Sequence, residues 1–347
     1  MKRSNESAFQ LAFVYVGTVV GAGFATGKEI VEFFVRFGWI GLLGILISGI
    51  IFTGLGAKMM LISKRIEAES YQDMNRFLFG AAASRYINVV MFFILLGVTS
   101  VMISGAGAIF EEQLGISKEY GIFLTIILSV IVLFKGSKGL FGVNVLVVPM
   151  LIFFSLIVFL DSFVFSSSES YVLALQMGEG EWILSAVSYG AFNLALSQAV
   201  LVPVANEMTS EAVIKKGAVL GGGMLTLILL VCFLSLSSLD MLEAFDIPMA
   251  QVVYQVANSI HLIYLFVIFG EVFTSVIGNL YGLERQVRAY IRMNSILTIS
   301  LILLCCYVIS KIGYGTLIST VYPIFGYVSI FFILFLSLKK VPASLDK

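Results

Sequence analysis

Charged side chains are scarce in this sequence of 347 residues. Asp, Glu, Lys and Arg make up 12% of it, whereas hydrophobic residues make up 59%. A soluble protein of ordinary composition is about one quarter charged and roughly half apolar. So few charges could not cover so much apolar surface in water, and lipid must therefore surround most of the chain. The composition predicts an integral membrane protein with one transmembrane domain, residues 1–347, whose main partner is the lipid bilayer.

Several residue types that carry chemistry are also nearly missing. Lys and Arg (21) balance Asp and Glu (21), so no basic surface indicates nucleic-acid binding. The lone histidine, His261, cannot form a zinc cluster, and Cys232, Cys305 and Cys306 lie in apolar runs typical of core residues. A convergent nucleophile, base or metal set is absent, which argues against an enzyme. We expect no catalytic residues and no cofactor. The expected partner, besides the bilayer, is a small-molecule substrate.

Long apolar runs recur along the whole chain, and a membrane-spanning helix needs about 20 mostly apolar residues. Ten such runs are present, which predicts an all-α fold with ten transmembrane helices. A short helix outside the membrane is expected over 248–258, opened by Pro248. The predicted spans are 8–36, 39–62, 86–110, 119–134, 143–160, 182–205, 217–238, 255–282, 295–311 and 316–338.

The basic residues predict the orientation of these spans. If the N-terminus is cytoplasmic, 17 of the 21 basic residues fall in cytoplasmic segments, and only Lys28, Arg36, Lys118 and Lys311 fall outside. An excess of Lys and Arg on the cytoplasmic side is the usual rule for membrane proteins. The sequence therefore predicts a multi-pass protein of the cell membrane with both termini in the cytoplasm. It does not predict the oligomeric state.

The ten spans divide into two halves, 8–160 and 182–338, and the first span of each half is interrupted. The first contains "GTVVGAGFATGKE" (17–29), and the sixth reads "SAVSYGAFNLALSQAVLVP" (185–203). Interrupted spans at matching positions of two halves are a pointer to a transporter binding site. Because each half has an odd number of spans, we predict a five-plus-five inverted repeat with discontinuous first and sixth helices.

A broken helix in lipid frees backbone groups that a ligand can use. Free carbonyls can bind a cation, and the start of a half-helix favours an anionic group. Gly21 and Gly23 have no side chain to keep a ligand from the backbone, and the second half-helix is expected to start near Thr26. The alternative is that Gly17, Gly21, Gly23 and Gly27 serve only close helix packing, without any break.

The segment "GTVVGAGFATGKE" resembles the first helix of the amino acid–polyamine–organocation superfamily, whose members have the leucine-transporter fold. In its length and number of spans, the whole chain resembles the YkvI-type bacterial membrane proteins. The eighth span reads "FGEVFTSVIGNLYG" and carries adjacent hydroxyls, Thr274 and Ser275, one turn after Glu271.

The resemblance implies two sites. A sodium ion would lie among the carbonyls of Gly17, Val20 and Glu271 and the hydroxyls of Thr274 and Ser275, because a hard cation prefers oxygen ligands. A substrate carboxylate would lie against the N–H groups of Ala22 and Gly23, and Gly21 would also belong to the substrate site. Tyr189 and Asn193 on the sixth span would contact the rest of the substrate.

Three ionisable residues depart from the pattern that the resemblance implies. An ionisable group at membrane depth is by default a functional hypothesis, so Glu271 is predicted to carry a proton or bind the cation directly. The alternative is that Glu271 pairs with a buried cation such as Lys58. Lys28 and Glu29 follow the expected break and are predicted to act as a gate or an internal ion pair. Sodium and protons both remain candidate coupling ions.

These features predict a secondary transporter that moves an amino acid or a related small amine by alternating access, coupled to sodium or protons. The alternative is a membrane receptor or sensor that keeps the transporter fold and binds a ligand without net flux. Neither a pore ring nor an ATPase motif is present to indicate a channel or a primary pump.

Overall fold

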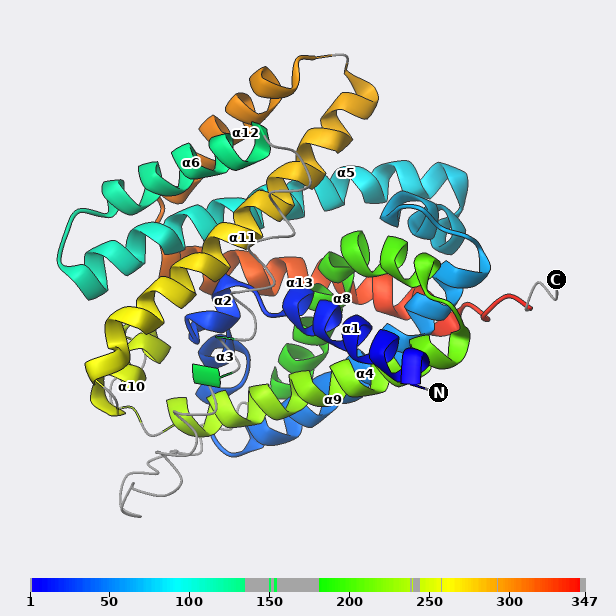
Figure 1. Ribbon diagram of the computed structural model, residues 1–347, viewed down its shortest axis with the longest axis horizontal. Helices are drawn as coiled ribbons and strands as arrows, with labels where there is room; N and C mark the ends of the chain where they lie inside the picture. The colour runs from blue at the N-terminus through cyan, green and yellow to red at the C-terminus, as the bar shows by residue number, and fades with distance from the viewer. Residues whose placement is uncertain are drawn as a thin grey trace.

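The computed structural model describes residues 2–134, 150, 153–154, 181–237, 239, 244–256, 258–291 and 293–343, and these residues form helices and contain no strand. The helices are α1 (Lys2–Val19), α2 (Ala22–Ala25), α3 (Lys28–Phe33), α4 (Ile40–Arg65), α5 (Tyr71–Ala108), α6 (Lys118–Phe134), α8 (Glu181–Glu207), α9 (Glu211–Leu236), α10 (Pro248–Val256), α11 (Asn258–Tyr290), α12 (Ser295–Ser310) and α13 (Tyr314–Leu338). Short 3₁₀ and π turns cover Val35–Phe37 and Ile109–Gln113. Figure 1 shows their arrangement.

Six of the described helices are long and apolar enough to cross a membrane: α4, α5, α8, α9, α11 and α13. The apolar stretches 8–19 and 295–310 are shorter. The short helix expected at Pro248 is present as α10, separate from α11. The predicted fifth span (143–160) and the loop after it lie almost wholly outside the described residues, so the count of ten spans stays a prediction.

Two groups of four helices make up most of the structure. One group contains α1, α4, α8 and α9, and the other contains α5, α6, α11 and α12. The two groups occupy the lower and upper parts of Figure 1, and α13 runs between them and contacts both. Each group combines helices from both predicted halves, which is the pairing that an inverted repeat would give. The repeat itself stays a prediction.

Glycines allow the helices of the first group to approach closely. A Cβ added to Gly221 of α9 would meet the ring of Tyr15 at 2.8 Å, and one added to Gly190 of α8 would meet Ile51 at 2.9 Å. Small residues at contacts are the common basis of helix packing in membranes. A hydrogen bond also joins α1 to α4, since the Tyr15 hydroxyl donates to the carbonyl of Phe52 at 2.8 Å.

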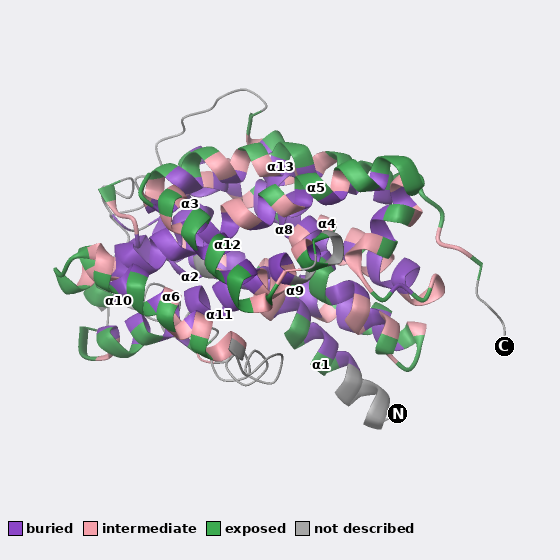
Figure 2. Ribbon diagram, turned by 90° about the horizontal axis from the view of Figure 1, so that it is seen from above, coloured by how far each residue is buried: buried purple, intermediate pink, exposed green. Residues whose placement is uncertain are grey.

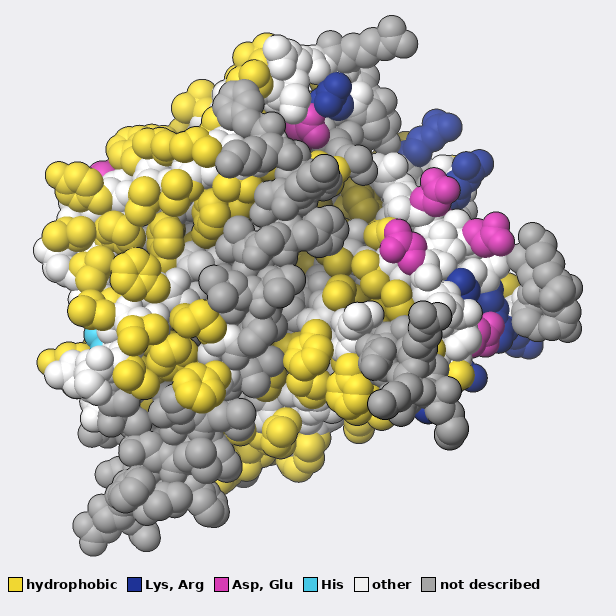
Figure 3. Space-filling view, in the orientation of Figure 1, with side chains coloured by type: hydrophobic (Ala, Val, Ile, Leu, Met, Phe, Trp, Pro, Cys, Tyr) yellow, Lys and Arg dark blue, Asp and Glu magenta, His cyan; other side chains and the backbone are white. Residues whose placement is uncertain are grey.

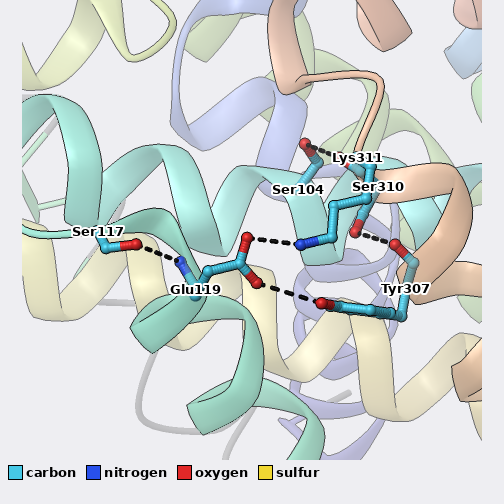
Figure 4. A network of polar contacts seen from close by, with 6 residues as sticks. All are labelled: Ser104, Ser117, Glu119, Tyr307, Ser310 and Lys311. Atoms are coloured by element: carbon cyan, nitrogen blue, oxygen red, sulfur yellow. Dashed lines mark hydrogen bonds and ion pairs between the residues drawn. The ribbon is translucent and has the colours of Figure 1, made fainter.

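A polar network joins α5, α6 and α12 at one end of the second group (Figure 4). The Lys311 ammonium donates to Glu119 at 2.5 Å, and Ser104 donates to the carbonyl of Ser310 at 3.0 Å. Both members of the ion pair are more than a third exposed, so solvent screens the pair and it contributes little to stability. It fixes where α6 and α12 meet more than it contributes to stability.

The prediction that the sixth span is discontinuous is wrong. The sixth span was expected to be discontinuous, yet α8 is one helix from Glu181 to Glu207 with Pro203 inside it. The polar residues taken as an interruption bond to their own helix: Asn193 donates to the carbonyl of Tyr189 at 3.1 Å and Ser197 to that of Leu194 at 3.1 Å. Such back-bonding satisfies a polar side chain inside a helix without breaking it.

The surface divides into an apolar part and a charged end. Hydrophobic side chains cover much of the face in Figure 3, and most of the charged residues visible there gather at the right-hand end. In Figure 1, α1 begins and α13 ends on that side. Figure 2 shows that buried residues line the faces that the helices turn toward one another. This distribution fits a protein whose middle lies in lipid.

We predict that the charged end is cytoplasmic. In a variant whose native cysteines are replaced by alanine, a cysteine at the exposed Ile116, between α5 and α6, should react with an impermeant maleimide added to intact cells. A cysteine at the exposed Glu69, between α4 and α5, should react only after the membrane is opened. The reverse labelling pattern would show that the orientation, and the cytoplasmic assignment of the termini, is wrong.

Candidate functional site

The first span is broken, as the glycine-rich segment predicts. Helix α1 ends at Val19, residues 20 and 21 are not helical, and α2 begins at Ala22. The amide of Val20 still donates to Val16, and the amide of Ala25 donates to Gly21. Within the described part of the chain, nothing donates a hydrogen bond to the carbonyl of Gly17 or of Val20. The break therefore leaves two backbone acceptors available to a ligand.

A second interruption follows at Thr26 and Gly27. Gly27 has a φ of 81°, a conformation that glycine adopts more easily than other residues. The Thr26 hydroxyl, fully buried, lies 3.1 Å from the carbonyl of Gly23 and 2.7 Å from the hydroxyl of Tyr314. The chain was expected to resume as one half-helix near Thr26, and it resumes instead as α2 and α3 with this turn between them.

One face of the break lies against α11. A Cβ added to Gly21 would be 3.6 Å from the hydroxyl oxygen of Ser275. Thr274 is buried and donates to the carbonyl of Glu271 at 3.0 Å. The Glu271 side chain is only 1% exposed, and its Oε1 has no hydrogen-bond partner in the structure. The first and eighth spans therefore meet at Gly21, where the sequence predicted a cation site.

Lys58 does not neutralise Glu271. Its ammonium donates to the carbonyl of Ser337, near the end of α13, at 2.7 Å in an exposed position. None of the ion pairs between described residues includes Glu271 or Glu29. The alternative that Glu271 serves a structural pair with Lys58 is therefore wrong.

The other face of the break lies against α3, α8 and α13. A Cβ added to Gly23 would collide with Oε2 of Glu29 and would be 3.2 Å from the ring of Tyr322. The Glu29 side chain, on a residue that is 4% exposed, accepts a hydrogen bond of 3.3 Å from the amide of Asn193. The turn at Gly27 brings Glu29 back toward Gly23, so an acidic group occupies the place expected for a substrate carboxylate.

Tyr189 completes this face. Its ring packs edge-on against Phe34, with centroids 4.8 Å apart, and contacts Phe33 and Phe52. Its hydroxyl is buried, lies near the carboxyl group of Glu29 and makes no hydrogen bond of normal geometry. Among the predicted substrate residues, Gly23, Tyr189 and Asn193 therefore gather around Glu29, whereas Gly21 faces α11. Nothing is described for the side chain of Ala22.

Lys28 points away from Glu29. Its ammonium donates to the carbonyl of Phe245 at 2.8 Å, and the amide of Met249 donates to the carbonyl of Thr26 at 2.9 Å. Glu112 accepts hydrogen bonds from the amides of Asp246 and Ile247. The segment that leads into α10 is thus attached to the second interruption on one side and to the π turn Ile109–Gln113, after α5, on the other.

Sequence analysis did not find the two tyrosines of α13. Tyr314 and Tyr322 are fully buried and reach Thr26 and Gly23. Their spacing of eight residues places them on one helix face, but an apolar span that contains tyrosine does not reveal which element it faces.

The described residues contain no group of three His, Cys, Asp or Glu side chains that could hold a metal ion.

Two proteins of known sequence are similar to this chain over nearly its whole length. The membrane protein YkvI of Bacillus subtilis (strain 168) is 64% identical over 342 residues, which cover 99% of each chain. The chain belongs to the YkvI family. The protein YyaD of the same organism is 26% identical over 327 residues, covering 94% of this chain and 95% of YyaD. No protein-family profile matches the sequence.

Solved structures of transporters share the fold. Mhp1, a nucleobase-cation-symport-1 family transporter solved in a closed conformation with bromovinylhydantoin bound, aligns with a TM-score of 0.63 at 12% identity, covering 93% of this chain and 77% of its own. The manganese transporter of Eremococcus coleocola aligns with a TM-score of 0.57 at 13% identity, covering 95% and 78%. At these identities the likeness shows the leucine-transporter fold and does not identify a substrate.

The two glycines of the break should tolerate alanine differently. At Gly21 the added methyl group meets only an ordinary contact, whereas at Gly23 it collides with Glu29 and Tyr322. Overpacking a buried site costs about 1–3 kcal/mol. We expect Gly23→Ala to lower the free energy of unfolding by about that amount and Gly21→Ala by less than 1 kcal/mol, as measured by thermal unfolding in detergent. Equal losses of stability in the two variants would contradict the different packing around Gly21 and Gly23.

Proposed function

We propose that the chain is an ion-coupled secondary transporter of an amino acid or related small amine, coupled to sodium or protons and working by alternating access. The observation that carries the proposal is the broken first helix between the two helix groups. In lipid, a break leaves backbone groups that must find partners. Among the described residues the carbonyls of Gly17 and Val20 have none, and α11, which packs on α2, carries the buried Glu271, whose Oε1 makes no hydrogen bond.

The face toward α11 is proposed as the coupling-ion site. Carbonyls of Gly17 and Val20, the hydroxyls of Thr274 and Ser275 and the unpartnered oxygen of Glu271 are hard ligands suited to sodium. A proton is the alternative ion, and it would neutralise Glu271 directly. An unpaired carboxylate buried at this depth is costly, so binding either ion should stabilise the protein.

The opposite face is proposed as the substrate site, with Gly23, Tyr189 and Asn193 around it and Gly21 and Ala22 contributing backbone. The location fits a substrate-dependent switch, since the break joins both helix groups and α13. Lys28 is proposed to act as a gate, because it attaches the segment before α10 to the turn at Thr26. Opening on that side would have to release this attachment.

We predict that the ion acts through α11. If the ion is sodium, replacing Thr274 and Ser275 together by alanine removes two ligands, and sodium should then no longer raise substrate affinity. If the ion is the proton, Glu271→Gln should end accumulation driven by a pH gradient while exchange continues. The measurement is uptake of radiolabelled amino acids and amines by reconstituted vesicles under a sodium gradient or a pH gradient, imposed separately.

The matched control replaces Thr316 and Ser319, two exposed hydroxyl residues of α13, by alanine. This double variant should transport as the unmodified protein does. Uptake that neither gradient drives, in protein that binds the same compound normally, would contradict coupled transport and favour a sensor with a transporter fold.

A further inference from the structure

Glu29 is a buried acid whose charge the described residues do not balance. Its carboxyl group receives a hydrogen bond from Asn193, lies beside the Tyr189 hydroxyl and takes part in no ion pair among them. A carboxylate at membrane depth that lacks a cationic partner costs several kcal/mol. A proton or a bound cation must therefore neutralise it for at least part of the transport cycle.

The nearest basic residues are engaged elsewhere. Lys28 donates to the carbonyl of Phe245, and Arg36 pairs with Glu32 at 3.2 Å. Glu32 lies on α3 and Arg36 on the 3₁₀ turn Val35–Phe37 that follows it, both with partly exposed side chains. Among the described residues Glu29 thus forms no ion pair, although an internal ion pair was one of the two roles that the sequence suggested for it.

The surroundings of Glu29 combine hydroxyl and aromatic groups. The Tyr189 hydroxyl is fully buried beside the Glu29 carboxyl group, with which it makes no hydrogen bond of normal geometry. The ring of Tyr322 lies against Gly23 and packs on Phe192 with centroids 4.8 Å apart. A carboxylate beside aromatic faces and a hydroxyl group is the environment that recognises an organic ammonium group.

The same geometry disfavours a substrate carboxylate. An amino acid bound as the resemblance implied would place its carboxylate at Gly23, where Glu29 already lies. Two carboxylates in contact cannot both stay ionised in an apolar site without a cation between them. The proposed sodium ligands do not supply that cation, because they lie on the other face of the break, against Ser275.

We propose that Glu29 binds the ammonium group of a small organic amine that carries no carboxylate, with Tyr189, Asn193 and Tyr322 completing the site. This inference rests on the proposed transport function and narrows its substrate class from amino acids and amines to amines. A divalent metal would need more anionic or imidazole ligands than the described residues bring together.

The experiment compares pairs of compounds that differ only by a carboxylate: tyramine with tyrosine, phenethylamine with phenylalanine, and putrescine with ornithine. Ligand-induced thermal stabilisation of the purified full chain is titrated with each compound, with and without sodium. At least one amine should bind ten times or more tightly than its amino acid. Glu29→Gln should weaken that amine at least tenfold.

Glu32→Gln is the matched control, because it makes the same change one turn away on α3, where the side chain is partly exposed and already paired with Arg36. It should leave amine binding within twofold of the unmodified protein. If Glu29→Gln does not fold, the paired comparison on the unmodified chain still decides the substrate class.

Three outcomes would overturn the inference: amino acids that bind as tightly as their amines, no stabilisation by any amine, or manganese chloride alone stabilising the protein through Glu29. Measuring uptake of the bound amine by vesicles tests the proposed transport function separately from the proposed ligand class. An amine that binds through Glu29 but is not taken up by vesicles would refute transport and leave the ligand class standing.

Discussion

The constraint on which this structure depends is that backbone groups inside a membrane must find partners within the protein. Between α1 and α3 the chain gives up helical hydrogen bonds twice, at Val20–Gly21 and at Thr26–Gly27. Each unsatisfied buried group costs about 1–3 kcal/mol. Neighbouring helices supply part of what is lost: Tyr264 of α11 donates to the carbonyl of Ala25, and the amide of Met249 donates to that of Thr26. The carbonyls of Gly17 and Val20 receive no such bond from the described residues.

Two buried acids lie on opposite faces of one short segment. Gly21 faces Ser275 on the α11 side, and Gly23, two residues later, contacts Glu29. A ligand on one face and an ion on the other would both act on α2. Binding energy at either face can therefore change affinity at the other, and such coupling is reciprocal. The arrangement requires no direct contact between substrate and ion.

The sequence predicted an all-α membrane protein, the break at the first helix and the short helix at Pro248, because each depends on local composition. The prediction for α8 was wrong because polar residues in an apolar run have two physical explanations. Asn193 and Ser197 bond to carbonyls of their own helix, and a sequence does not distinguish this from an unwound segment. The contact between Glu29 and Gly23 could not be predicted either, since it depends on how far the chain turns at Gly27.

The continuity of α8 makes the two predicted halves unequal. In the described part of the chain, α8 is unbroken and packs along α4 and α13, with Ser188 against Gly326. Helix α8 is therefore suited to move as a rigid element with α1, α4 and α9. The breaks beside α2 are attached instead to α11 through Tyr264 and to α13 through Tyr314. Helix α3, however, is attached to the first group, because Ser185 and Asn193 of α8 donate hydrogen bonds to Phe33 and Glu29. A displacement of one helix group against the other would therefore act on the interrupted segment from Val20 to Gly27, which contacts both groups.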